Sequence, residues 1–249
     1  MSLVASRVFK SQDGFSERVA DLLNRVDCRL AVSAAEREAI FRLRYQAYLS
    51  EGVIKPSFAP NFTDAYDETD NVWLLGLYLD GELASSIRLH VASVAHPEFP
   101  SRKVFAEVLE PELAAGKIII DPTRFVTHRH YSRVNFGLTY ATVRLAWLAA
   151  AYFGADHLLA AVRAEHQAFY QRTFNHRLIC APRPYPLLAK PISLMTVHYD
   201  SVAGEVHRRY PFFRSTLFER RMLFDREAAI AHMEFPPPAN VANGMHHAA

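Results

Sequence analysis

Three polar clusters follow one another between Phe41 and Phe125 and hold the residue types that could do chemistry. They read F-R-L-R-Y-Q-A-Y-L-S-E-G, then D-A-Y-D ahead of a segment that ends in R-L, then I-I-I-D-P-T-R-F. Acids and arginines are expensive to bury unless they are paired. Their spacing over three elements that otherwise resemble core therefore indicates either a structural ion-pair network or a polar substrate pocket.

The composition argues against several other kinds of site. The chain has 249 residues, half of them hydrophobic, and a formal charge of only +2, so its total charge gives no signal for a polyanion partner. The arginine-rich stretch 207–226 is interrupted by apolar and acidic residues, which disfavours nucleic-acid binding. Cys28 and Cys180 match no metal or redox spacing. His128 and His130 lack a third ligand at a recognisable spacing, so we expect no metal.

The first residues and the apolar runs of the chain indicate where in the cell the protein is expected. The first residues, M-S-L-V-A-S-R-V-F-K, lack an apolar run long enough for a signal peptide. No segment approaches the roughly 20 apolar residues of a membrane span. We therefore expect a cytoplasmic protein without a membrane span.

The clearest local structure is a hairpin. Asp80-Gly81 suits a type I′ turn between strands over Val72–Leu79 and Leu83–Ala92. The S-A-A-E sequence from Ser33 is a capping box that predicts a helix to about Ser50. Hydrophobic periodicity predicts the remaining elements, which are helices within 14–27, 136–153 and 165–174 and strands over 28–32, 117–127, 157–162 and 191–199.

This order of elements indicates an α/β fold, in which a mixed central sheet has helices on both faces. We expect one domain over residues 1–234, in which 206–234 form a helical extension. The Pro- and Asn-rich tail over 235–249 is expected to be disordered.

The element order and the three clusters resemble the GNAT acyltransferase superfamily, and within it the acyl-homoserine-lactone synthases and the N-acyl amino acid synthases. In the lactone synthases a basic and aromatic cluster on the first helix precedes two aspartates three apart, an arginine ending a hairpin strand, and E-x-[ST]-R-[FY]. The matching residues, over roughly 30–130, are Arg42, Arg44, Tyr45, Asp64, Asp67, Arg88, Asp121, Arg124 and Phe125. The resemblance implies a GNAT-like acyl-CoA N-acyltransferase fold.

Two departures concern the acceptor side. Phe62 stands where the lactone synthases usually have an acid, and Asp121-Pro122 replaces a glutamate and a small residue. R-L-R-Y-x-x-Y with a nearby E-G looks closer to the N-acyl amino acid synthases. The resemblance therefore implies transfer of a medium- or long-chain fatty acyl group from acyl-carrier protein to the amine of an amino acid. A lactone synthase using S-adenosylmethionine and a non-catalytic acyl-carrier or lipid-binding module are the alternatives.

The same resemblance implies roles for single residues. A backbone N–H of Phe125 or Val126 would polarise the thioester carbonyl. Asp121 would hold the acceptor ammonium or accept its proton, and Arg88 with Arg124 would clamp an acceptor carboxylate. Arg44, Tyr45, Asp64 and Asp67 complete the implied substrate site, and a buried structural network is the alternative for these charged residues.

The segment H-R-H-Y-S-R-V-N-F-G-L (His128–Leu138) bears on the identity of the acyl donor. It has one glycine where GNAT enzymes usually have several. A loop of bulky residues cannot follow a diphosphate closely, so acyl-carrier protein is favoured as the thioester donor over coenzyme A. Arg129, Arg133, Arg163 and Arg172 would contact the carrier, unless they form a solvated face. Tyr170 would protonate the leaving thiolate, and a buried aromatic is its alternative role. No cofactor is expected besides the acyl-thioester co-substrate.

Overall fold

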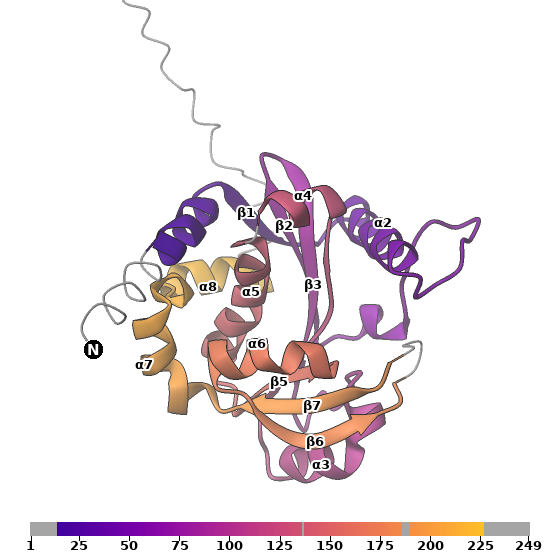
Figure 1. Cartoon of the computed structure of the whole chain (residues 1–249). Helices are drawn as coiled ribbons and strands as arrows, with labels where there is room; N and C mark the ends of the chain where they lie inside the picture. The colour runs from indigo at the N-terminus through magenta and orange to yellow at the C-terminus, as the bar shows by residue number, and fades with distance from the viewer. Residues whose placement is uncertain (1–13, 136, 186–189, 227–249) are drawn as a thin grey trace, which may run out of the picture.

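The computed structural model describes residues 14–135, 137–185 and 190–226, apart from the side chains of residues 133 and 134. One seven-stranded sheet in the order β1-β2-β3-β4-β5-β7-β6 forms its centre (Figure 1). The strands are β1 (Val26–Leu30), β2 (Val72–Leu79), β3 (Glu82–Ala92), β4 (Ile119–Thr127), β5 (His157–Val162), β6 (Arg177–Arg183) and β7 (Ile192–Val197). Only β4 and β5 pair in parallel, so the sheet is mixed, as the sequence predicts.

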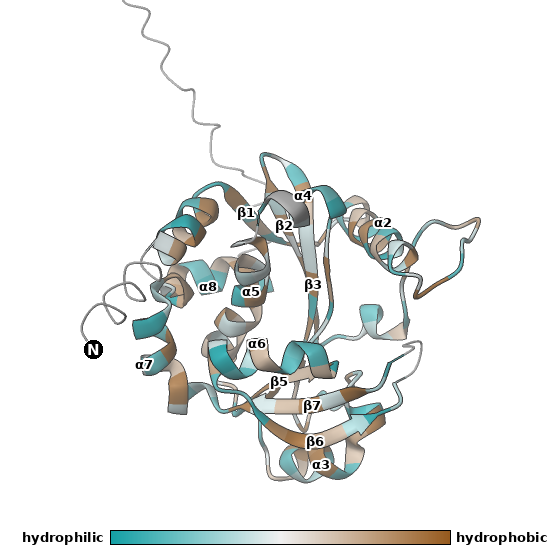
Figure 2. Ribbon diagram, in the orientation of Figure 1, coloured by the Kyte–Doolittle hydropathy of each residue, from teal (hydrophilic) through white to brown (hydrophobic). Residues whose placement is uncertain are grey.

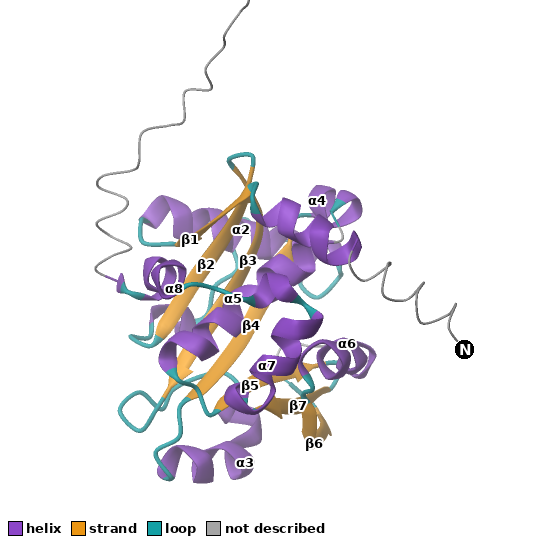
Figure 3. Cartoon of the chain, turned by 90° about the vertical axis from the view of Figure 1, so that its left-hand side faces the viewer, coloured by secondary structure: helices purple, strands orange, loops and turns teal. Residues whose placement is uncertain are grey.

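The helices lie on both faces of the sheet. They are α2 (Ala34–Ser50), η1 (Ala65–Glu68), α3 (Arg102–Ala114), α4 (Arg129–Val134), α5 (Gly137–Phe153), α6 (Ala164–Phe174), α7 (Tyr199–Arg209), η2 (Pro211–Phe213) and α8 (Leu217–Phe224). A further helix occupies residues 14–23. Figure 3 shows α5, α7 and α8 in front of the strands, with α2 behind them.

Successive side chains of a strand point to opposite faces of the sheet, so the core residues are divided between the two faces. Leu75 and Ile120 point toward α5 and join the largest cluster, which is built around Trp147. Leu74, one residue along β2, instead packs with Ile40 of α2. In Figure 2 teal and brown stretches alternate along α2, α3 and α7, as expected for helices that bury one side only.

Several local predictions are confirmed in detail. The Ser33 hydroxyl accepts from the N–H of Glu36, whose carboxylate accepts from the N–H of Ser33 in return. Asp80 and Gly81 have φ values of 52° and 86°, which is the conformation that the type I′ turn requires.

Other predictions are wrong or incomplete. The first strand begins at Val26, two residues earlier than expected, and α7 begins at Tyr199 where the last strand was expected to continue. Helices α3 and α4 and strand β6 were not predicted. Pro111 inside α3 and a non-helical Phe105 obscure its helical pattern. Strand β6 is an edge strand with mostly exposed residues, so it lacks the alternation of a half-buried strand. The expected tail lies outside the described residues.

Arg144 of α5 ties the C-terminal segment to the core. Its buried guanidinium donates to the carbonyls of Phe212 (2.6 Å) and Arg214 (2.7 Å) and pairs with Glu219. We expect Arg144→Met to lower the free energy of unfolding by about 3 kcal/mol, because it leaves buried carbonyls without donors. Urea denaturation followed by circular dichroism measures this change. The exposed Arg208→Met on α7 is the control, and equal stability of the two variants would contradict the expectation.

Candidate active site where two parallel strands separate

Strands β4 and β5 run together for a short distance only. Ile119 pairs with His157 and Ile120 with Leu158, and no further pairs join these two strands. From Asp121 onward β4 continues beside β3 alone, so its β5 side no longer pairs with a strand. Asp121 is therefore the first residue of the separated part of β4, directly after the buried Ile119 and Ile120.

A bulge in β4 follows within a few residues. Ser86 of β3 faces Val126, and Arg88 faces Thr123, so one residue of β3 lies opposite two residues of β4. Arg124 takes a left-handed φ of 53° at this point, a conformation that costs a non-glycine residue about 1 kcal/mol or more. Phe125 and Val126, whose N–H groups the sequence proposes as oxyanion donors, stand at or directly after the bulge.

The predicted arginines and aspartates meet in one buried network on the α2 face of the sheet. Arg44 of α2 binds Asp67 of η1 at 2.7 Å, and both side chains are fully buried. Arg88 of β3 binds Asp67 at 2.9 Å and Asp64 at 2.6 Å. Arg124 of β4 binds the other oxygen of Asp64. Arginines from three elements thus converge on two carboxylates at η1.

The network holds more positive than negative charge. Burial alone would raise the pKa of Asp64 and Asp67, but the neighbouring arginines outweigh it and lower both pKa values, so both groups are anionic at neutral pH. Three arginines therefore face two carboxylates. The Nε and Nη2 atoms of Arg44 are buried and have no hydrogen-bond partner among the described residues. A further anion would balance this charge.

Arg88 and Arg124, the predicted clamp for an acceptor carboxylate, already bind side chains of the network. Arg88 donates from Nη1 to Asp64 and Asp67 and from Nε to Thr123. Arg124 donates to Asp64 from both Nε and Nη2. An acceptor carboxylate at these guanidinium groups would compete with Asp64, and the clamp stays a prediction.

Aromatic residues surround Arg124. Its guanidinium lies 4.8 Å from the ring centre of Phe62 and 3.4 Å from the Tyr48 hydroxyl. The ring of Phe62 therefore covers a cation at the position where the lactone synthases usually have an acid. Tyr45 lies outside these contacts. Its hydroxyl accepts a hydrogen bond from the Ser57 N–H at 2.8 Å and so holds the loop after α2 in position.

Asp121 is fully buried on the same sheet face. Its two oxygens accept from the N–H (3.0 Å) and hydroxyl (2.7 Å) of Ser101, the residue before α3. Burial raises the pKa of Asp121 to about 6, against the lowering effect of Ser101 and Arg88. A carboxyl with a pKa near the working pH suits a general base. Ser101 was missed because it lies in a loop twenty residues away.

His90 faces Asp121 across the β3–β4 pair and was also missed. Its Nε2 donates to the carbonyl of Tyr66 at 3.0 Å, which leaves Nδ1 as a buried acceptor without a partner among the described residues. Burial and the charge of Arg88 lower the pKa of His90 to about 3, so the ring is neutral. His90 therefore places a polar but uncharged side chain opposite Asp121.

The predicted donor-side residues lie around α4 and α6, which Figure 3 shows on the same side of the molecule. Arg129 is exposed at the start of α4, and Arg163 and Arg172 stand at the two ends of α6. The side chain of Arg133 lies outside the described part. Arg209 of α7 donates to the carbonyl of Arg172 at 2.9 Å and adds an unpredicted arginine there.

Gly137 and His128 have local structural roles. A Cβ at Gly137 would meet the side chains of Leu22 and Val19 at 3.2 and 3.4 Å, so this glycine lets the N-terminal helix pack closely. His128 caps α4, with Nδ1 accepting from the N–H of His130. In the described residues no group of three or more His, Cys, Asp or Glu side chains could hold a metal ion.

Tyr170 of α6 packs edge-on against Phe169 and His176. Burial raises the pKa of Tyr170 to about 12, so its hydroxyl is protonated at neutral pH. That state is compatible with the predicted acid, and the role stays a prediction.

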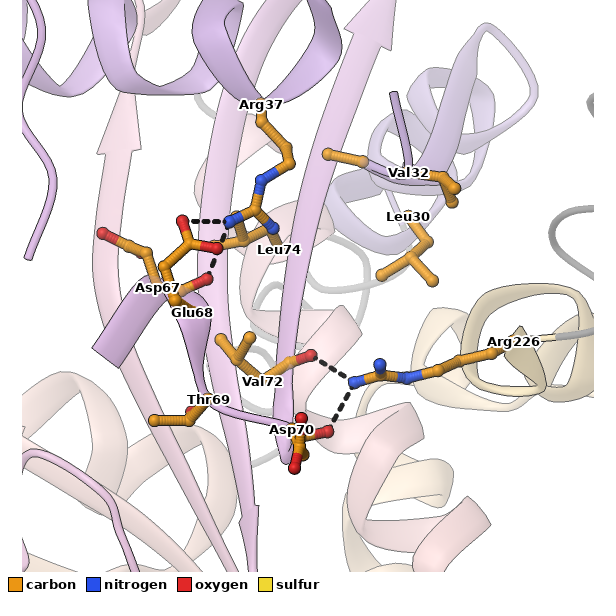
Figure 4. A pocket seen from close by; sticks show the side chains of 11 residues that line it. Leu30, Val32, Arg37, Asp67, Glu68, Thr69, Asp70, Val72, Leu74 and Arg226 are labelled. Atoms are coloured by element: carbon orange, nitrogen blue, oxygen red, sulfur yellow. Dashed lines mark hydrogen bonds and ion pairs between the residues drawn. The ribbon is translucent and has the colours of Figure 1, made fainter. Parts of the chain in front are cut away.

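A cavity of about 290 Å³ lies on the other side of η1 (Figure 4). Arg37, which donates to the carbonyl of Asp67 and to Glu68, closes one end. Arg226 closes the other end. It donates to the carbonyl of Asp70, in the loop before β2, and to the carbonyl of Val72, the first residue of β2. Leu30 and Leu74 form part of its apolar lining. The carboxylate of Asp67 is directed away from this cavity into the ion network.

None of the helices in the described ranges is long and apolar enough to cross a membrane. A search of curated proteins finds no match.

Solved structures share the fold at low sequence identity. FeeM, an N-acyl amino acid synthase from uncultured soil microbes, is 20% identical with a TM-score of 0.62, over 76% of this chain and 98% of that one. The acyl-homoserine-lactone synthase LasI is 14% identical with a TM-score of 0.53, over 69% of this chain and 88% of that one. BjaI, a CoA-dependent synthase of the same kind, is 17% identical with a TM-score of 0.52, over 75% and 89%.

These likenesses establish a GNAT-like acyltransferase fold, as the sequence predicts. The family model for the N-acyl amino acid synthase FeeM matches residues 39–198, which is more than half of the chain and includes every residue of the ion network. The chain therefore belongs to the FeeM family of N-acyl amino acid synthases and is an N-acyltransferase.

Proposed function

We propose that this enzyme moves a medium- or long-chain fatty acyl group from an acyl-carrier-protein thioester to the amine of a free amino acid. The observation that carries the proposal is Asp121, a buried carboxyl with a pKa of about 6 at the first residue where β4 leaves β5. An amine must lose a proton before it can attack a thioester, and this group is poised to take that proton near neutral pH.

The reaction would run in one ternary complex. The thioester lies along the side of β4 that no longer pairs with β5, and an N–H of Phe125 or Val126 at the bulge binds its carbonyl oxygen. Asp121 accepts a proton from the acceptor ammonium, and the neutral amine attacks the carbonyl carbon. The C–N bond forms, the C–S bond breaks, and the amine's second proton passes to the thiolate, with Tyr170 as the candidate acid. No covalent enzyme intermediate is needed.

The charge of the network supports an amino acid as the acceptor. Three arginines around two carboxylates leave one positive charge unbalanced, close to the base that would serve the amine. An α-amino acid brings a carboxylate and an ammonium on neighbouring atoms, and so supplies both charges that this face of the sheet lacks.

Two observations support acyl-carrier protein as the donor. The single glycine of the segment after β4, Gly137, is used to admit the N-terminal helix, so it is not free to bring backbone close to a diphosphate. Exposed arginines at α4 and α6 suit the phosphate and acidic surface of a carrier. BjaI is described as CoA-dependent, so the donor has to be tested directly.

Phe62 disfavours the lactone-synthase alternative. Its ring lies against the Arg124 guanidinium, where an acid would otherwise be available to the sulfonium and ammonium of S-adenosylmethionine. The amino-acid acceptor remains the better supported of the two.

The experiment combines the purified enzyme with medium- and long-chain acyl-carrier proteins, a pool of amino acids and S-adenosylmethionine, with products identified by mass spectrometry. We expect an N-acyl amino acid that forms only when both substrates are present. Parallel reactions with the matching acyl-CoA identify the donor. A lactone product, or thioester that stays intact with every amine, would contradict the proposal.

A further inference from the structure

Ser101 stands directly before α3, at the position from which a serine side chain commonly caps a helix. Its carbonyl accepts from the N–H groups of Val104 (3.2 Å) and Phe105 (3.0 Å), as in the first turn of a helix. Its hydroxyl, however, makes no capping hydrogen bond to α3. The hydroxyl donates instead to Asp121 of β4 at 2.7 Å. The serine side chain therefore serves the candidate base rather than the helix that it precedes.

Both oxygens of Asp121 are bound by this one residue. The Ser101 N–H donates to Oδ2 at 3.0 Å and the hydroxyl donates to Oδ1 at 2.7 Å, and both side chains are fully buried. A donor on each oxygen prevents the carboxylate from rotating about its Cβ–Cγ bond. No further donor among the described residues binds either oxygen, so each keeps a lone pair that can accept a proton.

Residues away from the base fix the backbone of Ser101. The buried side chain of Asn71 donates to three carbonyls within residues 91–98, the segment that leads to Ser101. The fully buried Phe99 belongs to the same apolar cluster as Phe105 of α3. The chain is thus held by hydrogen bonds before Ser101 and by core packing on both sides of it.

We propose that Ser101 is a positioning residue for acyl transfer, which fixes the Asp121 carboxylate in one orientation and favours its ionised form. This inference rests on the proposed function, in which Asp121 accepts a proton from the acceptor ammonium. A hydroxyl bound to a carboxylate stabilises the anion, and 2.7 Å is a short distance typical of such charge-assisted bonds. Once Asp121 is protonated, the hydroxyl can rotate and accept a hydrogen bond instead.

The other groups that act electrostatically on Asp121, or on which Asp121 acts, keep their charge near neutral pH. Arg88 is cationic and also favours the carboxylate. His90, opposite Asp121 on β3, has a pKa of about 3 and is neutral. Burial, with a smaller effect of the Asp121 charge, raises the pKa of Tyr66 and Tyr185, so both phenols stay protonated. Among these described groups, only Asp121 changes charge near pH 6.

The pH–rate profile of Ser101→Ala tests the inference. Removal of the hydroxyl takes one donor from the anion, so we expect the acid limb to move from about pH 6 upward by about one pH unit. The rate at pH 6 should fall about fivefold, and the rate at pH 8.5 should stay within about twofold of wild type because the backbone N–H still binds the carboxylate. Ser101→Cys, whose thiol is a weaker donor, should move the limb in the same direction by less.

The matched control is Ser201→Ala. It removes an exposed hydroxyl of α7 that donates to the carbonyl of His198, and it should leave the acid limb unchanged.

Urea denaturation at several pH values reports the ionisation of Asp121 without turnover. The folded-state pKa of Asp121 lies above its ordinary value, so stability falls as pH rises, until about pH 6 in wild type. In Ser101→Ala this fall should continue to about one pH unit higher. In the Asp121→Asn background, removal of the same hydroxyl should cost the same stability at every pH in this range.

An unmoved acid limb in Ser101→Ala, with a wild-type limb at about pH 6, would overturn the inference alone. A loss of stability that is independent of pH would do the same, because it would assign the hydroxyl to structure. If Ser101→Ala does not fold, the limb of Ser101→Cys decides by the same criterion. A wild type that acylates no amino acid would overturn the proposed function, and the role of Ser101 in acyl transfer with it.

Discussion

Asp121→Asn should lower kcat at least a hundredfold at pH 7.5, while the variant remains folded. An amide cannot accept the proton of the acceptor ammonium, and a positioned base typically contributes 10²- to 10⁴-fold. The carboxamide is nearly isosteric and can keep its hydrogen bonds to Ser101. In the wild-type enzyme the acid limb of the pH–rate profile should lie at about pH 6, because the raised pKa of Asp121 makes the base inactive below it.

The same substitution should make the protein more stable at neutral pH. The pKa of Asp121 in the folded state is about 6, above its ordinary value of 3.8, so the folded state binds more protons than the unfolded state between these values. Wild-type stability therefore falls as pH rises through this window, by roughly 3 kcal/mol at the upper bound. Asp121→Asn lacks this loss, so its stability relative to wild type should improve from pH 4 to pH 7.

Urea denaturation at several pH values and initial rates measured on the same samples test both effects. Asp27→Asn, an exposed aspartate of β1 paired with Arg29, is the matched control and should change neither quantity. A variant that keeps wild-type activity would exclude Asp121 as the base. A variant that loses activity and stability together would assign the carboxylate to structure.

Local sequence signals predicted the parts of the fold whose determinants are adjacent in the chain. The capping box at Ser33 and the Asp80-Gly81 turn specify their geometry through neighbouring residues, so both are confirmed. Helix α3 could not be recognised in the same way, because Pro111 and the kink at Phe105 interrupt its pattern. Its position is set by packing against β6 and by the hydrogen bonds between Ser101 and Asp121.

The site was predictable in its residue types and only partly in its connections. Spacing and family resemblance identified Arg44, Asp64, Asp67, Arg88 and Arg124, and these side chains do meet. The sequence left two interpretations open, a structural network and a substrate pocket, because it does not show which arginine faces which acid.

The structure divides these roles within one network. Asp67 is enclosed between two buried arginines, whereas Asp64 and Arg124 are partly exposed. Ser101 binds Asp121 from a loop whose position depends on tertiary packing, so no local signal could reveal it.

Asp67→Ala should therefore be the most destabilising single change in the site, at about 3–5 kcal/mol. It leaves Arg44 and Arg88 buried without a carboxylate between them, and the cost of removing one partner of a buried ion pair is of this size. Glu68→Gln is the control on the next residue. Its pair with Arg37 is exposed on the glutamate side, so we expect a loss of less than about 1 kcal/mol.

The dependence on pH separates this effect from that of Asp121. The arginines lower the pKa of Asp67 below its ordinary value, so its contribution to stability is complete above that value and is lost as pH falls below it. The difference in unfolding free energy between wild type and Asp67→Ala should thus shrink as the pH falls below about 4, the reverse of the Asp121 effect. A pH-independent difference would mean that lost packing, rather than unpaired charge, causes the instability.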